Sequence, residues 1–249
     1  MRFSLLKELA ITDFKLRYKN SVLGYLWSLL KPLAIFGSLY LVFSIFVRFD
    51  VPNYSLFLLL GILLWNYFTE ATLNGMHALE TKSTLLTKIN VNKFTIVLAS
   101  NVTTLLTLVL NLAIFFVILA FVKPEIGWTV LALPLVVANL FMISLGLSLA
   151  LSVWYVRLRD LSSIWEILLQ IGFWVTPIIY PLSMVPDRFL GYIGLNPLHR
   201  IIHEGRQLLI ELIWPRPSSM LITTAIMLLF LALGYVVFKS KEKNIAEEL

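Results

Sequence analysis

The chain has 249 residues, 59% of them hydrophobic and 14% charged, and its mean hydropathy is +0.87. Soluble domains have about 45–50% apolar and about 25% charged residues, so this composition excludes a soluble enzyme, a disordered protein and a disulfide scaffold. The absence of cysteine excludes thiol catalysis and thiolate metal sites. The formal net charge of +6 comes from basic residues that border apolar runs, which favours a membrane surface over nucleic acid as the partner.

Six charge-free runs predict an all-α integral membrane protein with six transmembrane helices. They are 32–47, 51–69, 94–122, 126–156, 167–186 and 217–238. A helix needs about 20 apolar residues to cross about 30 Å of hydrocarbon. The first run is short, so its helix is expected to begin within 26–30, and Pro134 suggests that the fourth crossing starts near Leu135. The whole chain, 1–249, is expected to form one transmembrane domain.

The distribution of Lys and Arg predicts the orientation. With six spans, one side of the membrane holds 14 basic residues and the other holds 6. The positive-inside rule therefore places both termini in the cytoplasm. The first span is interpreted as an uncleaved anchor, because the charged segment before it lacks the short apolar core and small-residue cleavage site of a signal peptide.

The N-terminal segment 1–25 is predicted to contain an amphipathic helix on the cytoplasmic leaflet. Polar and charged residues recur at helical spacing on one face of 3–19, and apolar residues on another. A generic basic flank that only helps topology would show a similar pattern.

The segment 79–92 lies between the second and third spans and includes TKSTLLTKINV at 81–91. A short helix held at both ends by membrane helices can transmit force from a soluble partner. A solvated loop is the alternative interpretation.

The segment 176–206 is apolar and aromatic but is interrupted by four prolines. It is predicted to form short re-entrant helices at the outer mouth, since broken backbone is tolerated in a membrane only where protein or a watery cavity surrounds it. The functional interpretation is a gate within 181–206, and the alternative is a structural hairpin packed between spans.

Four motifs in order resemble the ABC-2-type polysaccharide exporter permeases, which move O-antigen, capsule or teichoic-acid polymers across the inner membrane. The motifs are KLRYKNSVLGYLW at 15–27 followed by Pro32, RDL at 159–161, TPIIY at 176–180 and NPL at 196–198. Each motif alone is weak, but their order and the six-span layout extend the resemblance over essentially the whole chain.

The resemblance implies a homodimer in the bacterial inner membrane, with one ATP-binding subunit under each protomer. That partner would bind ATP and Mg, and this chain would hold no cofactor. The segment 1–25 would be the interface helix. ATPase coupling would fall to Thr81, Lys82, Ser83, Thr84, Leu85, Leu86, Lys88, Arg159 and Asp160, and the outer gate would include Pro181, Pro186, Tyr192, Asn196 and Pro197.

Two aromatic stripes are candidates for lining a sugar conduit, because sugar C–H faces stack on aromatic rings. Phe36, Tyr40 and Phe43 share one face of the first span, and Phe173 and Tyr180 share a face of the fifth with Trp174 adjacent. Lipid-facing or core positions are the alternative for both stripes.

A polyprenyl-diphosphate carrier is the expected handle on such a polymer and calls for fixed cations at the cytoplasmic leaflet. Arg17, Lys19 and Lys31 cluster by sequence at that depth. Attraction to anionic lipid heads explains the same residues equally well.

Catalysis by this chain is not expected, because no GxxxxGK[ST], HExxH or GxSxG motif occurs. His199 and His203 have i, i+4 spacing, but no further ligand indicates a metal site. Two other functions stay open: a membrane transferase acting on polyprenyl-linked sugars, and an ABC-2 drug or lipid exporter. The transferase would need acidic residues at one membrane face, whereas the aspartates are spread over both.

Overall fold

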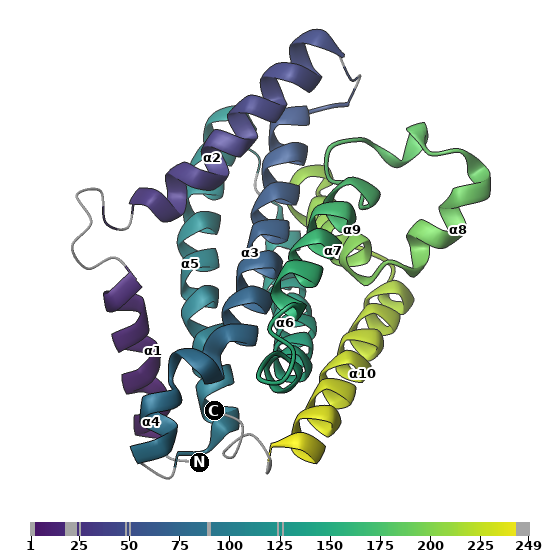
Figure 1. Cartoon of the computed structure of the whole chain (residues 1–249). Coiled ribbons are helices and arrows are strands. Elements are labelled where there is room, and N and C mark those ends of the chain that lie inside the picture. The colour runs from purple at the N-terminus through teal and green to yellow at the C-terminus, as the bar shows by residue number, and fades with distance from the viewer. Residues whose placement is uncertain are drawn as a thin grey trace.

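A computed structural model describes residues 3–17, 24, 26–47, 49, 51–88, 91–123, 125 and 127–242. This part of the chain is helical and contains no strand (Figure 1). The elements in order are α1 (Phe3–Arg17), α2 (Leu26–Tyr40), the π-helix η1 (Leu41–Phe46), α3 (Tyr54–Thr81), α4 (Ser83–Lys88), α5 (Lys93–Val122), the 3-10 helix η2 (Trp128–Ala132), α6 (Leu133–Tyr155), α7 (Leu161–Val175), the 3-10 helix η3 (Leu182–Met184), α8 (Asp187–Leu195), α9 (Pro197–Arg206), the π-helix η4 (Gln207–Glu211) and α10 (Pro217–Lys241).

Five helical stretches in the described residues are long and apolar enough to cross a membrane. They are Leu26–Ile45, Tyr54–Thr81, Lys93–Val122, Trp128–Tyr155 and Pro217–Lys241. The run 167–186 was predicted to be one continuous span. In the structure the helix at this place, α7, begins at Leu161 and already ends at Val175. Pro177 removes a helical N–H and disfavours helix in the residue before it, which accounts for the early end. With 15 residues, α7 is shorter than a perpendicular crossing requires.

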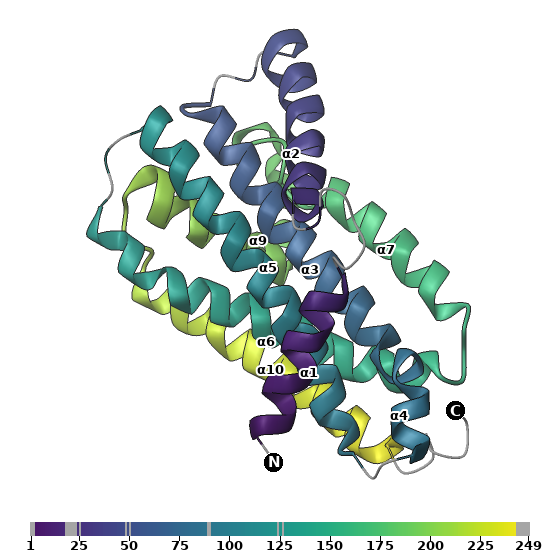
Figure 2. The same cartoon turned by 90° about the vertical axis from the view of Figure 1, so that its left-hand side faces the viewer.

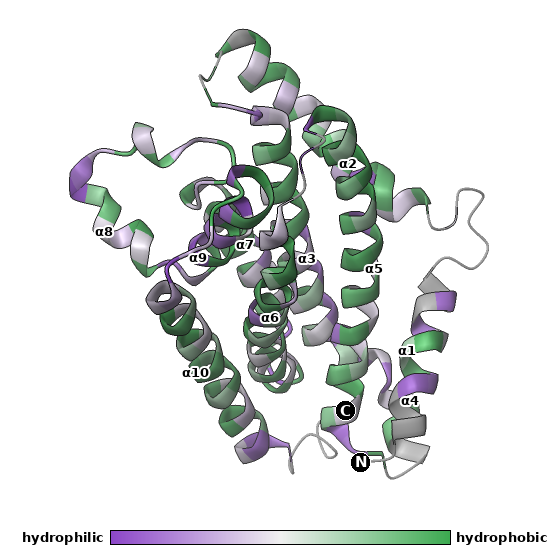
Figure 3. Ribbon diagram, turned by 180° about the vertical axis from the view of Figure 1, so that it is seen from behind, coloured by the Kyte–Doolittle hydropathy of each residue, from purple (hydrophilic) through white to green (hydrophobic). Residues whose placement is uncertain are grey.

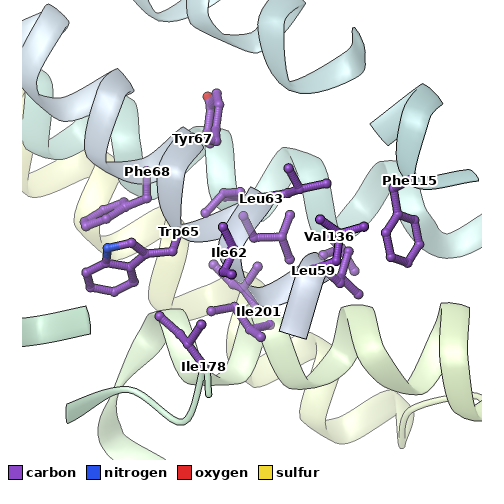
Figure 4. Close-up of a cluster of buried hydrophobic side chains, with 14 of the residues drawn as sticks. Leu59, Ile62, Leu63, Trp65, Tyr67, Phe68, Phe115, Val136, Ile178 and Ile201 are labelled. Carbon is purple, nitrogen blue, oxygen red and sulfur yellow. The ribbon is translucent and has the colours of Figure 1, made fainter. Parts of the chain in front are cut away.

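Helix α3 forms the centre of the bundle and packs against α5 and α6 along its length. Of its apolar window, 72% is buried. Figure 4 shows a cluster of buried side chains around α3, including Leu59, Ile62 and Leu63 of α3, Val136 of α6 and Ile201 of α9. Because lipid is as apolar as leucine, this arrangement is stabilised by close van der Waals packing rather than by escape from water.

Helices α6 and α10 make the most extensive contact in the molecule. Their backbones meet at Gly146 and Gly234, where a β-carbon on Gly234 would lie 1.9 Å from the carbonyl oxygen of Gly146. Small residues allow membrane helices to approach this closely. The pair therefore fixes α10 against the bundle.

Helices α2 and α7 lie at the edge of this bundle and are mostly unburied. Only 6% of the apolar window of α2 is buried, and Leu169 is the one buried residue of α7. Hydrophobic residues nevertheless run along most of the long helices, whereas hydrophilic residues gather on α1 and at the tip of α8 (Figure 3). The apolar surface of α2 and α7 is thus available to lipid or to another chain.

Helix α1 covers 3–17 of the segment predicted at 1–25, and residues 18–23 and 25 lie outside the described part. Its polar residues Glu8, Thr12 and Lys15 are exposed or partly so. Ala10 on the other face is 4% exposed, and its carbonyl accepts a hydrogen bond from the hydroxyl of Thr103 in α5 at 3.3 Å. The apolar face of α1 therefore packs on α5 at Ala10.

The short helices divide between the two ends of the bundle. Helices α1 and α4 lie at the same end as the last turns of α10, and α8 and α9 lie toward the other end (Figures 1 and 2). The Lys93 ammonium at the start of α5 donates to the carbonyl of Glu242, just after α10. We call the end with α1 and α4 the α4 end, and the opposite one the α9 end.

Candidate functional site

The backbone after α7 is held by side chains from two other elements. The amide of Asn196 donates to the hydroxyl of Thr176 at 2.9 Å, and the phenol of Tyr54 donates to the carbonyl of Ile179 at 3.0 Å. Both bonds join residues far apart in the sequence. The Tyr54 bond supplies a donor to a backbone carbonyl beyond the end of α7, and the Asn196 bond joins two side chains.

Arg206, at the end of α9, completes this junction. Its guanidinium makes four hydrogen bonds, to the carbonyls of Pro177 (2.7 Å) and Ile178 (2.8 Å) and twice to that of Phe57 (3.1 and 3.3 Å). It also stacks on the Phe57 ring, 3.3 Å from the centroid. Only 4% of Arg206 is exposed. The planar fork of arginine suits this role, because one side chain can satisfy several carbonyls at once.

The TPIIY and NPL motifs are therefore brought together, and Arg206 and Tyr54 join them. Sequence reasoning missed these two residues. Arg206 had a signal, since a cation within a largely apolar segment points to a buried partner set. No sequence signal pointed to Tyr54, because its contact with Ile179 arises only when distant segments fold together. We call this group of bonds the α9 junction.

The predicted gate residues mark the boundaries of the short helices. Pro181 and Pro186 directly precede η3 and α8, and Pro197 is the first residue of α9. The Asn196 side chain caps α9 by accepting a backbone N–H at 3.0 Å. Tyr192 on α8 is 74% exposed. The gate role of these residues stays a prediction.

The aromatic stripe of α2 packs toward the start of α3. Phe36 stacks on Tyr40 with centroids 5.5 Å apart, Tyr40 stacks on Tyr54 at 6.3 Å, and Phe43 stacks on Phe49 at 5.4 Å. Within one protomer these rings attach the outer part of α2 to the bundle. Their role in lining a conduit stays a prediction.

The second stripe divides at the end of α7. Phe173 packs edge-on against Trp65 of α3 at 6.0 Å, whereas Trp174 is 54% exposed. The expectation that Tyr180 shares a helical face with Phe173 is wrong, because the helix ends at Val175. The Tyr180 hydroxyl instead turns back to the carbonyls of Trp174 and Val175, at 3.2 and 3.0 Å.

A groove of about 310 Å³ lies where α2, α3 and α7 meet. Ile35 comes from α2, Trp65 and Asn66 from α3, and Gln170 and Phe173 from α7. One aromatic residue of the second stripe and two amides thus face a common space. The structure does not bring Tyr40 or Phe43 into this groove.

A larger cavity of about 580 Å³ opens at the α9 end. Its walls include Phe57, Lys123, Pro181, His203 and Glu211. His199 also lines it, and burial, above all, lowers the pKa of this imidazole to about 4. Burial likewise lowers the pKa of His203. Helix α9 lies outside the five long spans.

The predicted coupling segments meet at the α4 end. Helix α3 ends at Thr81, and Lys82 separates it from α4. Lys82 pairs with Asp13 of α1, and Arg159 lies 3.5 Å from the carboxylate of Glu80. The turn that carries Arg159 and Asp160 thereby lies beside the α3–α4 break.

Side chains behind this surface make further contacts. His77 Nε2 lies 3.1 Å from Ser162 Oγ, and Leu86 of α4 packs with Leu9 of α1 on a buried cluster around Leu79. The predicted interface helix α1 and the predicted coupling helix α4 thus share one packed base. Thr81, Ser83, Thr84 and Leu85 belong to the same break and helix.

The three candidate cations for the diphosphate are only partly described. Lys31 lies on α2 and is exposed. Lys19 and the side chain of Arg17 lie outside the described part of the structure, and so does the side chain of the coupling residue Lys88. The proposed phosphate cluster therefore stays a prediction.

Comparison with known sequences decides the family. The family of ABC-2 type transporters matches residues 4–210, which include the α4 end, the α9 junction and every long helix except α10. The chain belongs to the ABC-2 transporter family. As an ABC-2 membrane subunit it is a transport protein rather than an enzyme, and ATP hydrolysis belongs to a separate subunit of such transporters.

The similar proteins of this ABC-2 subunit are export permeases. It is 30% identical over 211 residues (83% of this chain, 80% of the relative) to the O-antigen export system permease protein RfbA of Klebsiella pneumoniae. It is 28% identical over 247 residues (98% and 95%) to the protein of the same name in Myxococcus xanthus. Polysialic acid transport protein KpsM of Escherichia coli is 22% identical over 243 residues (95% and 93%). The resemblance inferred from the four motifs is confirmed.

Proposed function

We propose that two copies of this chain export a lipid-linked polysaccharide, an O-antigen, from the cytoplasm to the periplasm through a channel at their interface in the inner membrane. The relatives named for O-antigen export support the class of cargo. The observation that carries the proposal is the unburied apolar flank of α2 and α7, which border a groove containing aromatic and amide side chains. A second protomer placed on this flank would enclose the groove.

The aromatic rings are the proposed contact surface for the polymer. Trp174 is exposed on this flank, and Phe173 reaches the groove. Many similar stacking contacts let a sugar chain slide without tight binding at one place. The rings of Tyr40 and its neighbours hold α2 in position and would join the lining in the dimer.

The number of membrane crossings in this proposal is six, and α7 provides the sixth. Helix α7 together with the turn and bend at 176–180 would complete a sixth crossing, with α8 and α9 as re-entrant gate helices at its outer end. Six crossings would put both termini on one side of the membrane, and the distribution of basic residues predicts that this side is the cytoplasm.

One ATP-binding subunit would dock under each protomer at the α4 end. The α3–α4 break and the Arg159 turn lie side by side there, so a single partner can contact both. That partner would bind ATP and Mg. Movement of α4 would reach α3 and α1 through the short connection at Lys82.

The aromatic lining is tested by Tyr40→Ala and Trp174→Ala. Both variants are expected to reduce the amount of surface polymer severalfold at an unchanged amount of folded protein, and the double variant more. Trp128→Ala is the matched control, since Trp128 is 83% exposed away from the groove. Unchanged export and conductance in the double variant would contradict the channel.

The proposed role of Arg17, Lys19 and Lys31 is tested on the partner's ATPase. Neutralising Arg17 and Lys31 to Gln is expected to weaken the stimulation of ATP hydrolysis by lipid-linked substrate, because fixed cations no longer meet the diphosphate. The measurement compares stimulated with basal hydrolysis in vesicles of constant lipid composition. Equal stimulation would favour simple attraction to lipid heads.

A further inference from the structure

The cavity at the α9 end is lined by two neighbouring histidines, His199 and His203. His199 is 7% exposed, and its Nδ1 has no hydrogen-bond partner among the described residues. Its ring stacks on that of His203, with centroids 5.7 Å apart and planes 17° apart. Both rings line the cavity. The Nδ1 atom of His199 is itself buried away from solvent, so a ligand in the cavity would meet the other atoms of the two rings.

The positive charges of Arg206 and Lys123 at the cavity are already engaged. The buried guanidinium of Arg206 is bound by three backbone carbonyls, and the ammonium of Lys123 donates to the carbonyl of Ile210 at 2.6 Å. The carboxylate of Glu211 adds a negative charge to the lining. A phosphate or another small anion would therefore find few free cationic donors here.

The groups that remain are hydrogen-bonding side chains beside apolar walls. The imidazoles of His199 and His203 and the amide of Asn53 provide donors and acceptors. Pro177, Pro181 and Leu182 provide apolar surface. This mixture suits a ligand that presents hydroxyl groups at its edge and C–H groups on its faces. The volume of about 580 Å³ lies within the usual range of small-ligand sites.

We infer that this cavity is a binding site for a segment of hydroxyl-rich sugar chain at the exit side of the transporter, with His199 and His203 as its hydrogen-bonding residues. The inference rests on the proposed export of a polysaccharide. The site is separate from the α2–α7 groove. It borders the α9 junction and the gate segment at Pro181. A sugar bound there would contact the broken segment after α7 and helix α9 together.

The test uses the absence of native cysteine, which leaves a single introduced thiol as the only one in the chain. Glu211→Cys places a thiol on the exposed rim of the cavity, and Glu125→Cys places one on an exposed residue outside its lining. Spheroplasts that carry the full transporter are treated with a membrane-impermeant maleimide. Labelling rates are compared between cells that make the polymer and cells blocked in its synthesis.

Glu211→Cys is expected to label about tenfold more slowly in polymer-making cells. This corresponds to polymer at about ten times the concentration that half-fills the site. Glu125→Cys is expected to label equally in both. Equal labelling of Glu211→Cys in both cells, with polymer still reaching the surface, would overturn the site and leave the export proposal intact. Slowing of both thiols would also overturn it, since that indicates general shielding. Absence of export from the unmodified chain would instead refute the proposed function.

Two additions sharpen the result. Released polymer added to non-producing spheroplasts distinguishes sources: protection there identifies free glycan as the ligand, and protection only during synthesis identifies polymer in transit. Adding His203→Asn to Glu211→Cys is expected to abolish most of the protection, with folding checked by thermal unfolding in detergent. Full protection in a folded His203→Asn protein would overturn the role given to the histidine pair.

Discussion

Helices α3 and α2 are both apolar and long enough to cross a membrane, yet 72% of the window of α3 is buried and only 6% of that of α2. In lipid, apolar character alone does not decide which helix goes inside, because the surroundings are equally apolar. Close contact requires small residues, and Gly75 of α3 lies against Ser148 of α6 whereas Gly37 of α2 faces open space. The core of this protein is thus set by where small side chains let backbones meet.

The largest effect is expected where two backbones touch. Gly234→Ala places a methyl group against the carbonyl of Gly146, where no side chain can move aside. We expect a loss of about 3 kcal/mol in the free energy of unfolding, at the upper end of overpacking costs. Unfolding by denaturing detergent in mixed micelles measures it.

The matched control is Gly37→Ala on the open helix, with nothing within 4 Å of the new carbon. This variant is expected to gain about 0.5–1 kcal/mol, since glycine is a poor helix former. If both substitutions had equal effects, the contrast between the core and the α2 flank would be wrong.

The second effect concerns the α9 junction. Arg206→Met keeps the bulk of the side chain but leaves the carbonyls of Pro177 and Ile178 without their donor. We expect a loss of about 2 kcal/mol of stability, and Arg206→Lys to restore only part of it because a single ammonium cannot bridge both carbonyls. Proteolysis of the segment after α7 provides a local readout.

Arg216→Met is the control for this change, since Arg216 is exposed and its side chain does not cap α10. It is expected to leave stability and cleavage unchanged. Full rescue by lysine would show that charge alone, rather than the planar fork, holds the broken segment.

Much of this fold is readable from the sequence. The long charge-free runs predict the five long helices, and the prolines of 176–206 coincide with the ends of short helices. The end of α7 at Val175 was not predicted, because the span was drawn from the charge-free run 167–186 and the helix-breaking effect of Pro177 was not applied to it. The contact of Gly146 with Gly234 was also hidden, since these residues are far apart in the chain.

The candidate site is less readable. Aromatic spacing identified Phe36 and Tyr40 as neighbours, and their rings do stack. The partners of the TPIIY and NPL motifs, Tyr54 and Arg206, depend on how four separate segments meet. The sequence order of the motifs indicated a family, but only the fold shows that the motifs touch each other.

The smallest effect is expected at the edge of the bundle, where Lys82 pairs with Asp13 of α1 and each side chain is 23% exposed. Asp13→Asn is expected to cost at most about 1 kcal/mol of stability, because partly exposed ion pairs contribute little, and the cost should shrink at high salt. Glu8→Gln on the exposed face of α1 is the control. The exchange Asp13→Lys with Lys82→Asp is expected to restore the pair.

Since this contact connects α1 to the α3–α4 break, its loss should lower the polymer exported per ATP hydrolysed more than it lowers stability. A drop in stability as large as that of Gly234→Ala would place α1 in the core rather than at its edge.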